Sequence, residues 1–129
     1  MSTAQIELMK LYVDDIRNAP DETWQVARTV TAAIRAIALF PCTEISLDHD
    51  ISHQVVLGKL SRPYPCEETF EAVAHFIAAK YRNEFDVPKI TLHTSNPIGA
   101  DKMRSVLADA NIKCEIKLTG AANRLEMEV

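Results

Sequence analysis

EISLDHD, at residues 44–50, is a short strand pattern that runs directly into three polar side chains. Two further predicted strands, residues 6–13 and 88–93, end in the same way. The polar residues at these three strand ends are Asp14, Asp15, Asp48, His49, Asp50 and His93. Because the carboxyl ends of parallel strands meet at one edge of a sheet, where ligands bind, we expect these side chains to gather there.

Helical patterns separate the predicted strands. One helix starts at Val30 with Thr29 as its N-cap, a second spans residues 67–82, and a third runs from about Gly99 or Ala100 to Ala110. This alternation predicts an α/β fold with a mainly parallel sheet in three layers, forming one domain over residues 1–129.

Four other segments complete the expected layout. Residues 112–118 are predicted to form another strand, and residues 124–129 are a candidate for one more, paired back as a hairpin. Residues 24–28 suit either a short strand or the first turn of the following helix. Residues 51–65, with serine, glycine and two prolines, are expected to form a long loop.

The composition restricts the class of partner. The net charge is −4 at pH 7, so a basic groove that follows a long nucleic acid is not expected, although a metal could supply positive charge for a nucleotide. The first residues do not resemble a signal peptide, and no apolar run is long enough to cross a membrane. We therefore expect a cytoplasmic protein without membrane contact.

The acidic residues at the strand ends are the candidate metal ligands. Clustered carboxylates raise one another's pKa unless a cation neutralises them, and carboxylate oxygens are the ligands that Mg²⁺ and Mn²⁺ prefer. Each aspartate could instead only cap a strand end or turn. The expected ligands of Mg²⁺ or Mn²⁺ are Asp14, Asp15, Asp48 and Asp50.

Histidine and arginine side chains beside these carboxylates are the candidate catalytic groups. His49 and His93 are suited to proton transfer, although either could be a metal ligand or a structural residue. Arg17 could bind a phosphate or neutralise the acidic pair. Ser95 and Asn96 offer a hydroxyl and an amide for substrate binding, or simply form an Asn-Pro turn.

Three segments together resemble the cyclic-phosphate processing receiver-like family. They are LYVDDIRNAPDETWQVARTV (residues 11–30), ISLDHDIS (residues 45–52) and ITLHTSNPIGADKM (residues 90–103). The resemblance implies a divergent receiver fold, in which residues 24–28 form the second strand and the first helix is reduced to a loop at residues 16–23. It also implies that Asp48 occupies the receiver phospho-acceptor position.

Two features depart from the receiver pattern. Lys117 has no proline after it, and the residues directly after DHD are Ile51-Ser52 rather than the Leu-Gly that commonly follows it in the family. The first departure argues against phospho-signalling, and the additional histidines favour hydrolysis.

Three functions remain in competition at this point. The preferred hypothesis is a metal-dependent phosphoesterase that acts on a cyclic phosphate of a nucleotide or RNA end, with Asp48, His49, His93 and Arg17 as candidate catalytic residues. The alternative is a non-catalytic receiver-like module that signals or binds a nucleotide. A structural adaptor with an idle site is the third.

Overall fold

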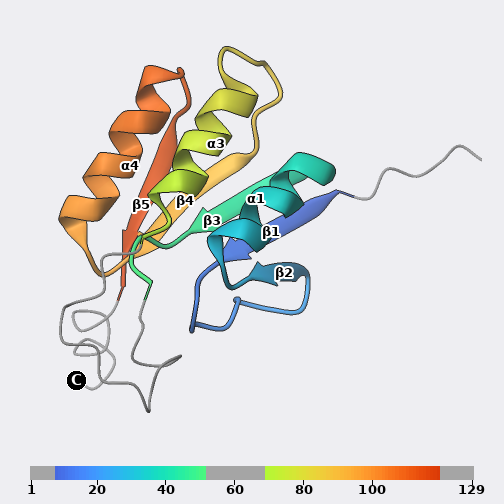
Figure 1. Cartoon of the computed structure of the whole chain (residues 1–129), viewed down its shortest axis with the longest axis vertical. Helices are drawn as coiled ribbons and strands as arrows, with labels where there is room; N and C mark the ends of the chain where they lie inside the picture. The colour runs from blue at the N-terminus through green and yellow to red at the C-terminus, as the bar shows by residue number, and fades with distance from the viewer. Residues whose placement is uncertain (1–7, 52–68, 120–129) are drawn as a thin grey trace, which may run out of the picture.

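The computed structural model of the chain describes residues 8–51 and 69–119, and these residues build a five-stranded sheet (Figure 1). All neighbouring strands are parallel, in the order β2-β1-β3-β4-β5. The strands are β1 (Met9–Val13), β2 (Trp24–Ala27), β3 (Cys42–Leu47), β4 (Lys89–Thr94) and β5 (Cys114–Leu118). The receiver-like α/β fold and the parallel sheet that the sequence predicts are confirmed.

Three helices lie side by side on one face of this sheet (Figure 1). They are α1 (Val30–Leu39), α3 (Glu71–Tyr81) and α4 (Pro97–Asp109). Each connects two parallel strands and moves across the sheet in the same direction, so right-handed crossovers place all three on the same side. The second helical layer of the predicted three-layer arrangement is not among the residues that the structure describes.

The connection from β1 to β2 carries no helix. Residues 14–23 form a loop, which includes the loop at residues 16–23 that the family resemblance implies. Residues 24–27 form strand β2. This connection runs in the opposite direction across the sheet, so a right-handed crossover brings it to the face that α1, α3 and α4 leave open. Arg17 lies within this loop.

The hydrophobic core lies between the sheet and the three helices. Alternate strand residues point into it, so Leu11, Val13, Ile45 and Leu47 are buried there. In α3 the buried residues include Val73, Ala74, Ile77 and Tyr81, and they are preceded by buried Phe70. In α1 the buried residues are Ala33 and Ile37.

Helix α4 starts earlier than the periodicity predicts. Pro97 is its first residue, because proline has no N–H to lose in a first turn and its φ angle suits a helix. The Asn96 side chain caps it by accepting a hydrogen bond from the Gly99 N–H at 2.9 Å. The N-cap that the sequence predicts, Thr29 at the start of α1, is confirmed by its bond from Ala32 N at 3.0 Å.

The predicted loop at 51–65, apart from Ile51, and the candidate strand at 124–129 lie outside the described residues. The chain segments on either side of residues 52–68 lie next to each other. Asp50 and Thr69 form an antiparallel bridge, and the Phe70 N–H bonds to His49 O at 2.7 Å. None of the described helices is long and apolar enough to cross a bilayer.

Candidate functional site

Three carboxylates meet at the carboxyl edge of the sheet. Asp14 and Asp15 follow β1, and Asp48 follows β3, which is the neighbour of β1. One oxygen atom of each lies within 4.8 Å of the others. The Asp48 N–H also bonds to Val13 O at 3.0 Å, so the sheet pairing itself brings the two segments into register. This is the convergence that the strand ends predict.

Asp14 is fully buried and is held as an anion by four hydrogen bonds. The backbone N–H groups of Ile16 and Arg17 donate to Oδ1 at 3.0 and 2.9 Å. The side chains of Arg17 and His93 donate to Oδ2 at 3.2 and 2.9 Å. Burial alone would raise the pKa of Asp14, but the bond from His93 and those from the backbone outweigh it and lower this pKa well below its usual range.

Asp48 lies in a less favourable environment and is only 5% exposed. Its burial, followed by the negative charge of Asp14, raises the pKa of Asp48 to about 6. The His49 N–H, which donates to Asp48 Oδ1 at 2.7 Å, together with His93 and Arg17, only partly offsets this effect. The cluster therefore holds more negative charge than its neighbours neutralise.

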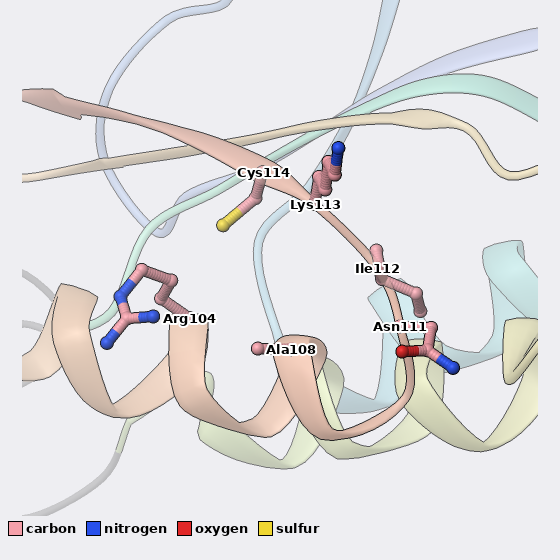
Figure 2. Close-up of a pocket in the computed structure, with 6 residues that line it drawn as sticks. All are labelled: Arg104, Ala108, Asn111, Ile112, Lys113 and Cys114. Atoms are coloured by element: carbon pink, nitrogen blue, oxygen red, sulfur yellow. The ribbon is translucent and has the colours of Figure 1, made fainter.

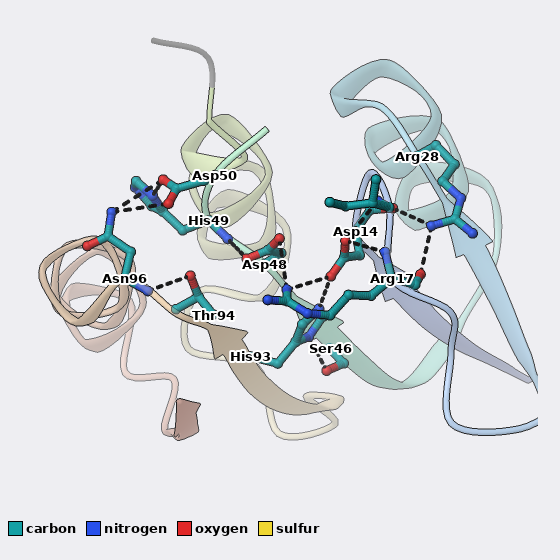
Figure 3. A network of polar contacts seen from close by, with 11 residues as sticks. Asp14, Arg17, Arg28, Ser46, Asp48, His49, Asp50, His93, Thr94 and Asn96 are labelled. Atoms are coloured by element: carbon teal, nitrogen blue, oxygen red, sulfur yellow. Dashed lines mark hydrogen bonds and ion pairs between the residues drawn. The ribbon is translucent and has the colours of Figure 1, made fainter. Parts of the chain in front are cut away.

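Arg17 lies between the two carboxylates (Figure 3). Its Nη1 is 3.2 Å from Asp14 Oδ2 and 3.5 Å from Asp48 Oδ2. Arg28 in turn donates from Nη1 to the carbonyl oxygens of Asp14 and Arg17 at 3.2 and 2.7 Å. Of the two roles that the sequence leaves open for Arg17, this geometry is that of a counter-ion to the carboxylates.

His93 lies beneath Asp14 on the sheet face that the described helices leave open. It is 3% exposed, and its ring stacks on Tyr12 with centroids 4.3 Å apart. Its Nε2 contacts Asp14 Oδ2, and its Nδ1 is 2.6 Å from Ser46 Oγ. Nε2–H donates to Asp14, and Nδ1 shares a hydrogen bond with the Ser46 hydroxyl whose direction depends on the tautomer. Both ring nitrogens therefore have a partner, and the ring contacts the carboxylates through Asp14.

A second polar group lies towards α3 and α4, around His49. His49 Nδ1 is 2.7 Å from Asp50 Oδ1, and His49 Nε2 is 2.6 Å from Glu71 Oε2 (Figure 3 shows the Asp50 side). The Asn96 amide donates to both Asp50 oxygens at 3.3 and 3.4 Å. The side chain of His49 thus joins the end of β3 to the first turns of two helices.

Gly99 is required where α4 passes this ring. A Cβ atom at position 99 would lie 2.4 Å from His49 Cγ and Nδ1, which is closer than side chains approach one another. The absence of a side chain lets the first turn of α4 pack directly on the imidazole.

Three predicted site residues do not join the three carboxylates, and one of them is Asn96, whose side chain contacts Asp50 and caps α4. Asp50, expected as a metal ligand, lies outside the group, because its carboxylate contacts His49 and Asn96 instead. Ser95, expected at the substrate, is exposed at the start of α4. The buried hydroxyl at this strand end is that of Thr94, which accepts a bond from Asn96 N at 3.1 Å.

The sequence interpretation missed four residues of the network, which are Tyr12, Arg28, Ser46 and Glu71. Ser46 had a usable signal, since a serine between the apolar Ile45 and Leu47, two residues before Asp48, must point to the same side as Asp48. Arg28 stood in one of the quoted segments but carried no assigned role. For the other two residues the sequence indicated only that Tyr12 lies in a strand and that Glu71 lies on the surface of a helix.

A groove of about 450 Å³ lies between α4 and β5 (Figure 2). It is lined by Arg104 and Ala108 of α4 and by the residues that lead into β5, ending at Cys114. This is the amino end of β5, at the opposite edge of the sheet from the carboxylates. The groove and the carboxylate cluster are therefore separate features.

The chain was compared with models of known protein families. The cyclic-phosphate processing receiver domain profile matches residues 9–109 of the 129. The match covers every described helix and strand except β5. Comparison with curated proteins and with solved structures finds no significant match.

Proposed function

The chain belongs to the cyclic-phosphate processing receiver domain family, and we propose that its carboxylate cluster is the site of a metal-dependent phosphoesterase. The substrate is a cyclic phosphate on a nucleotide or RNA end. In the reaction a water oxygen bonds to phosphorus, one ester P–O bond breaks, and the departing sugar oxygen takes up a proton. The product is a phosphomonoester.

The observation that carries the proposal is the imbalance of charge around Asp48. Three acidic oxygens lie within 4.8 Å of one another, and the pKa of Asp48 stands at about 6 despite Arg17 and His93. A site built only for stability would avoid a buried like-charge pair. A divalent ion resolves this imbalance, and hard oxygen donors on Asp14, Asp15 and Asp48 fit Mg²⁺ or Mn²⁺.

A bound ion would supply a Lewis acid that could polarise the phosphate and lower the pKa of a water. The residues of the chain provide position and charge. Asp14 is kept ionised by His93 and by backbone N–H groups. Arg17 supplies a guanidinium at the edge of the cluster for the phosphoryl oxygens.

Proton transfer is assigned to His49, because imidazole is suited to proton transfer near neutral pH. Asp48, as a ligand of the ion, would stay ionised and takes no proton in this scheme. His49 is hydrogen-bonded to the Glu71 carboxylate, whose side chain is about one-third exposed, so the imidazole has a route to solvent. His93 is a positioning residue in this scheme.

The test is a turnover screen with Mg²⁺ and Mn²⁺ against 2′,3′- and 3′,5′-cyclic nucleotides. We expect metal-dependent formation of a phosphomonoester by the wild type, and loss of most turnover in Asp48→Asn and in the presence of EDTA. Arg35→Gln, which changes an exposed residue on α1, is the matched control and should retain activity.

A different outcome would favour the alternative function, a receiver-like signalling module. If acetyl phosphate labels Asp48 while neither metal supports hydrolysis of any cyclic nucleotide, the protein is a phospho-accepting receiver and the phosphoesterase proposal is wrong.

A further inference from the structure

Arg17 and a divalent ion would need the same carboxylates. Arg17 Nη1 contacts Asp14 Oδ2 at 3.2 Å and Asp48 Oδ2 at 3.5 Å, and these two carboxylates belong to the group that could hold a metal. We propose that the Arg17 guanidinium is a resident cation that the metal displaces, and that the displaced guanidinium becomes the phosphate-binding group. This inference rests on the proposed metal-dependent function.

The backbone around Arg17 is tied down, so the exchange needs only a side-chain movement. The Arg17 N–H donates to Asp14 Oδ1 at 2.9 Å, and the Arg17 carbonyl accepts from Arg28 at 2.7 Å. Arg28 also holds the Asp14 carbonyl at 3.2 Å. These bonds fix both ends of the turn 14–17 through backbone atoms of Arg17, so its guanidinium can leave the carboxylates without breaking them.

The side chain of Arg17 has a route to solvent. It is 34% exposed, whereas those of Asp14 and Asp48 are 0% and 7% exposed. The guanidinium therefore covers the carboxylates from the solvent side, where an ion would enter. After its departure Asp14 retains the His93 bond and both backbone bonds, so the metal-binding group keeps its shape.

Charge makes the two cations exclude one another. Guanidinium cannot lose its proton at any physiological pH, so it cannot share the carboxylates with a dication by becoming neutral. Repulsion from the ion would then favour an outward rotamer of Arg17. In that position the planar fork can bind phosphoryl oxygens in a bidentate manner, which is how guanidinium groups recognise phosphate.

Two binding properties follow. First, Arg17 weakens metal binding in the absence of substrate, because the ion must replace a charge-assisted interaction. Second, metal and phosphate bind cooperatively beyond their direct attraction, because the ion frees Arg17 for the anion, and such coupling is reciprocal. A phosphate therefore binds this site tightly only after the metal has entered.

The experiment compares Mn²⁺ binding by the wild type, Arg17→Gln, Arg17→Lys and Arg35→Gln, measured by calorimetry at pH 8 so that Asp48 is ionised. Loss of one charge-assisted hydrogen bond should tighten Mn²⁺ binding of Arg17→Gln by about 10-fold or more. Arg17→Lys keeps a competing cation, so its Mn²⁺ affinity should stay near that of the wild type. Arg35→Gln should bind Mn²⁺ with the same affinity as the wild type.

Inorganic phosphate provides the second measurement. Adding Mn²⁺ should strengthen phosphate binding by the wild type much more than by Arg17→Gln. If Arg17→Gln binds Mn²⁺ no more tightly than the wild type, the exchange is wrong while the metal site stands. If neither protein binds Mn²⁺ at millimolar concentration, the metal-dependent function itself is wrong and the exchange is excluded with it. Binding by Arg17→Gln alone would support the exchange most directly.

Discussion

Replacing Asp48 with asparagine should stabilise the folded protein at neutral pH, although it removes a central residue of the proposed site. The Asp48 carboxyl is buried beside Asp14, and its pKa rises from an ordinary 3.8 to about 6 on folding. Asparagine resembles the protonated carboxyl in shape, and its oxygen can still accept the His49 N–H that now bonds to Oδ1. It therefore removes the cost of ionisation without removing that bond.

The sign and size of the effect follow from linkage. The folded state holds the Asp48 proton more tightly than the unfolded state, so the stabilisation by this proton is complete below pH 4 and is lost as the pH rises through 6. The cost to the wild type is about 1.5 kcal/mol at pH 5 and about 3 kcal/mol at pH 8. The melting temperature of Asp48→Asn should exceed that of the wild type at pH 8 by about 10 °C.

The assay is chemical and thermal unfolding of both proteins from pH 5 to pH 8 in EDTA. Titration of Asp14 does not affect this pH range, because its pKa is lowered and its contribution to the stability of the fold is lost only below pH 4. Asp14→Asn is the matched control and should destabilise the protein at pH 8, since it weakens the bonds from Arg17 and His93. Millimolar Mg²⁺ or Mn²⁺ should stabilise the wild type and so reduce the difference in melting temperature between it and Asp48→Asn. Equal or lower stability of Asp48→Asn at pH 8 would refute the reasoning.

Two further substitutions test the supports of the site. His93→Gln should weaken Mn²⁺ binding by about 10- to 100-fold, because Asp14 loses its buried partner, and an unchanged affinity would remove His93 from the site. Gly99→Ala should destabilise the fold by about 1–3 kcal/mol despite the better helix propensity of alanine, because its Cβ would lie 2.4 Å from His49 Cγ. Adding His49→Ala should restore most of that loss, and a Gly99→Ala protein as stable as the wild type would show that the ring can move aside.

The edge at which Asp14, Asp48 and His93 gather could be predicted from sequence, because it depends only on where strands end. Parallel strands place all their carboxyl ends together, whatever their side chains do. Errors of one or two residues at the element boundaries, such as the start of α4 at Pro97, leave this arrangement unchanged.

The side to which each residue points could also have been inferred from strand alternation. Leu47 points into the core, so Ser46 and Asp48 point to the face without described helices, and His49 points back to the helices. This alternation separates Asp48 from His49 although they are adjacent in the chain.

Long side chains from loops could not be placed in this way. Arg17 has several rotatable bonds, and its position is set by Asp48, which lies 31 residues away, and by Arg28. Likewise Glu71 reaches His49 only because residues 50 and 69 meet at a bridge after an intervening segment. Such contacts depend on the tertiary structure and leave no periodic pattern in the sequence.

The His49 network explains why the unfavourable charge at Asp48 persists in the folded protein. An isolated Asp48 could turn away from Asp14 and relieve the repulsion. Its Oδ1 is held by the His49 N–H, and the His49 ring is fixed by Asp50 and Glu71 and packed against α4 at Gly99. The backbone at residue 48 therefore cannot retreat without breaking contacts to two helices. The polar group around His49 thus holds Asp48 close to Asp14 despite the repulsion between the two carboxylates. Binding of a cation is favoured because it relieves this repulsion.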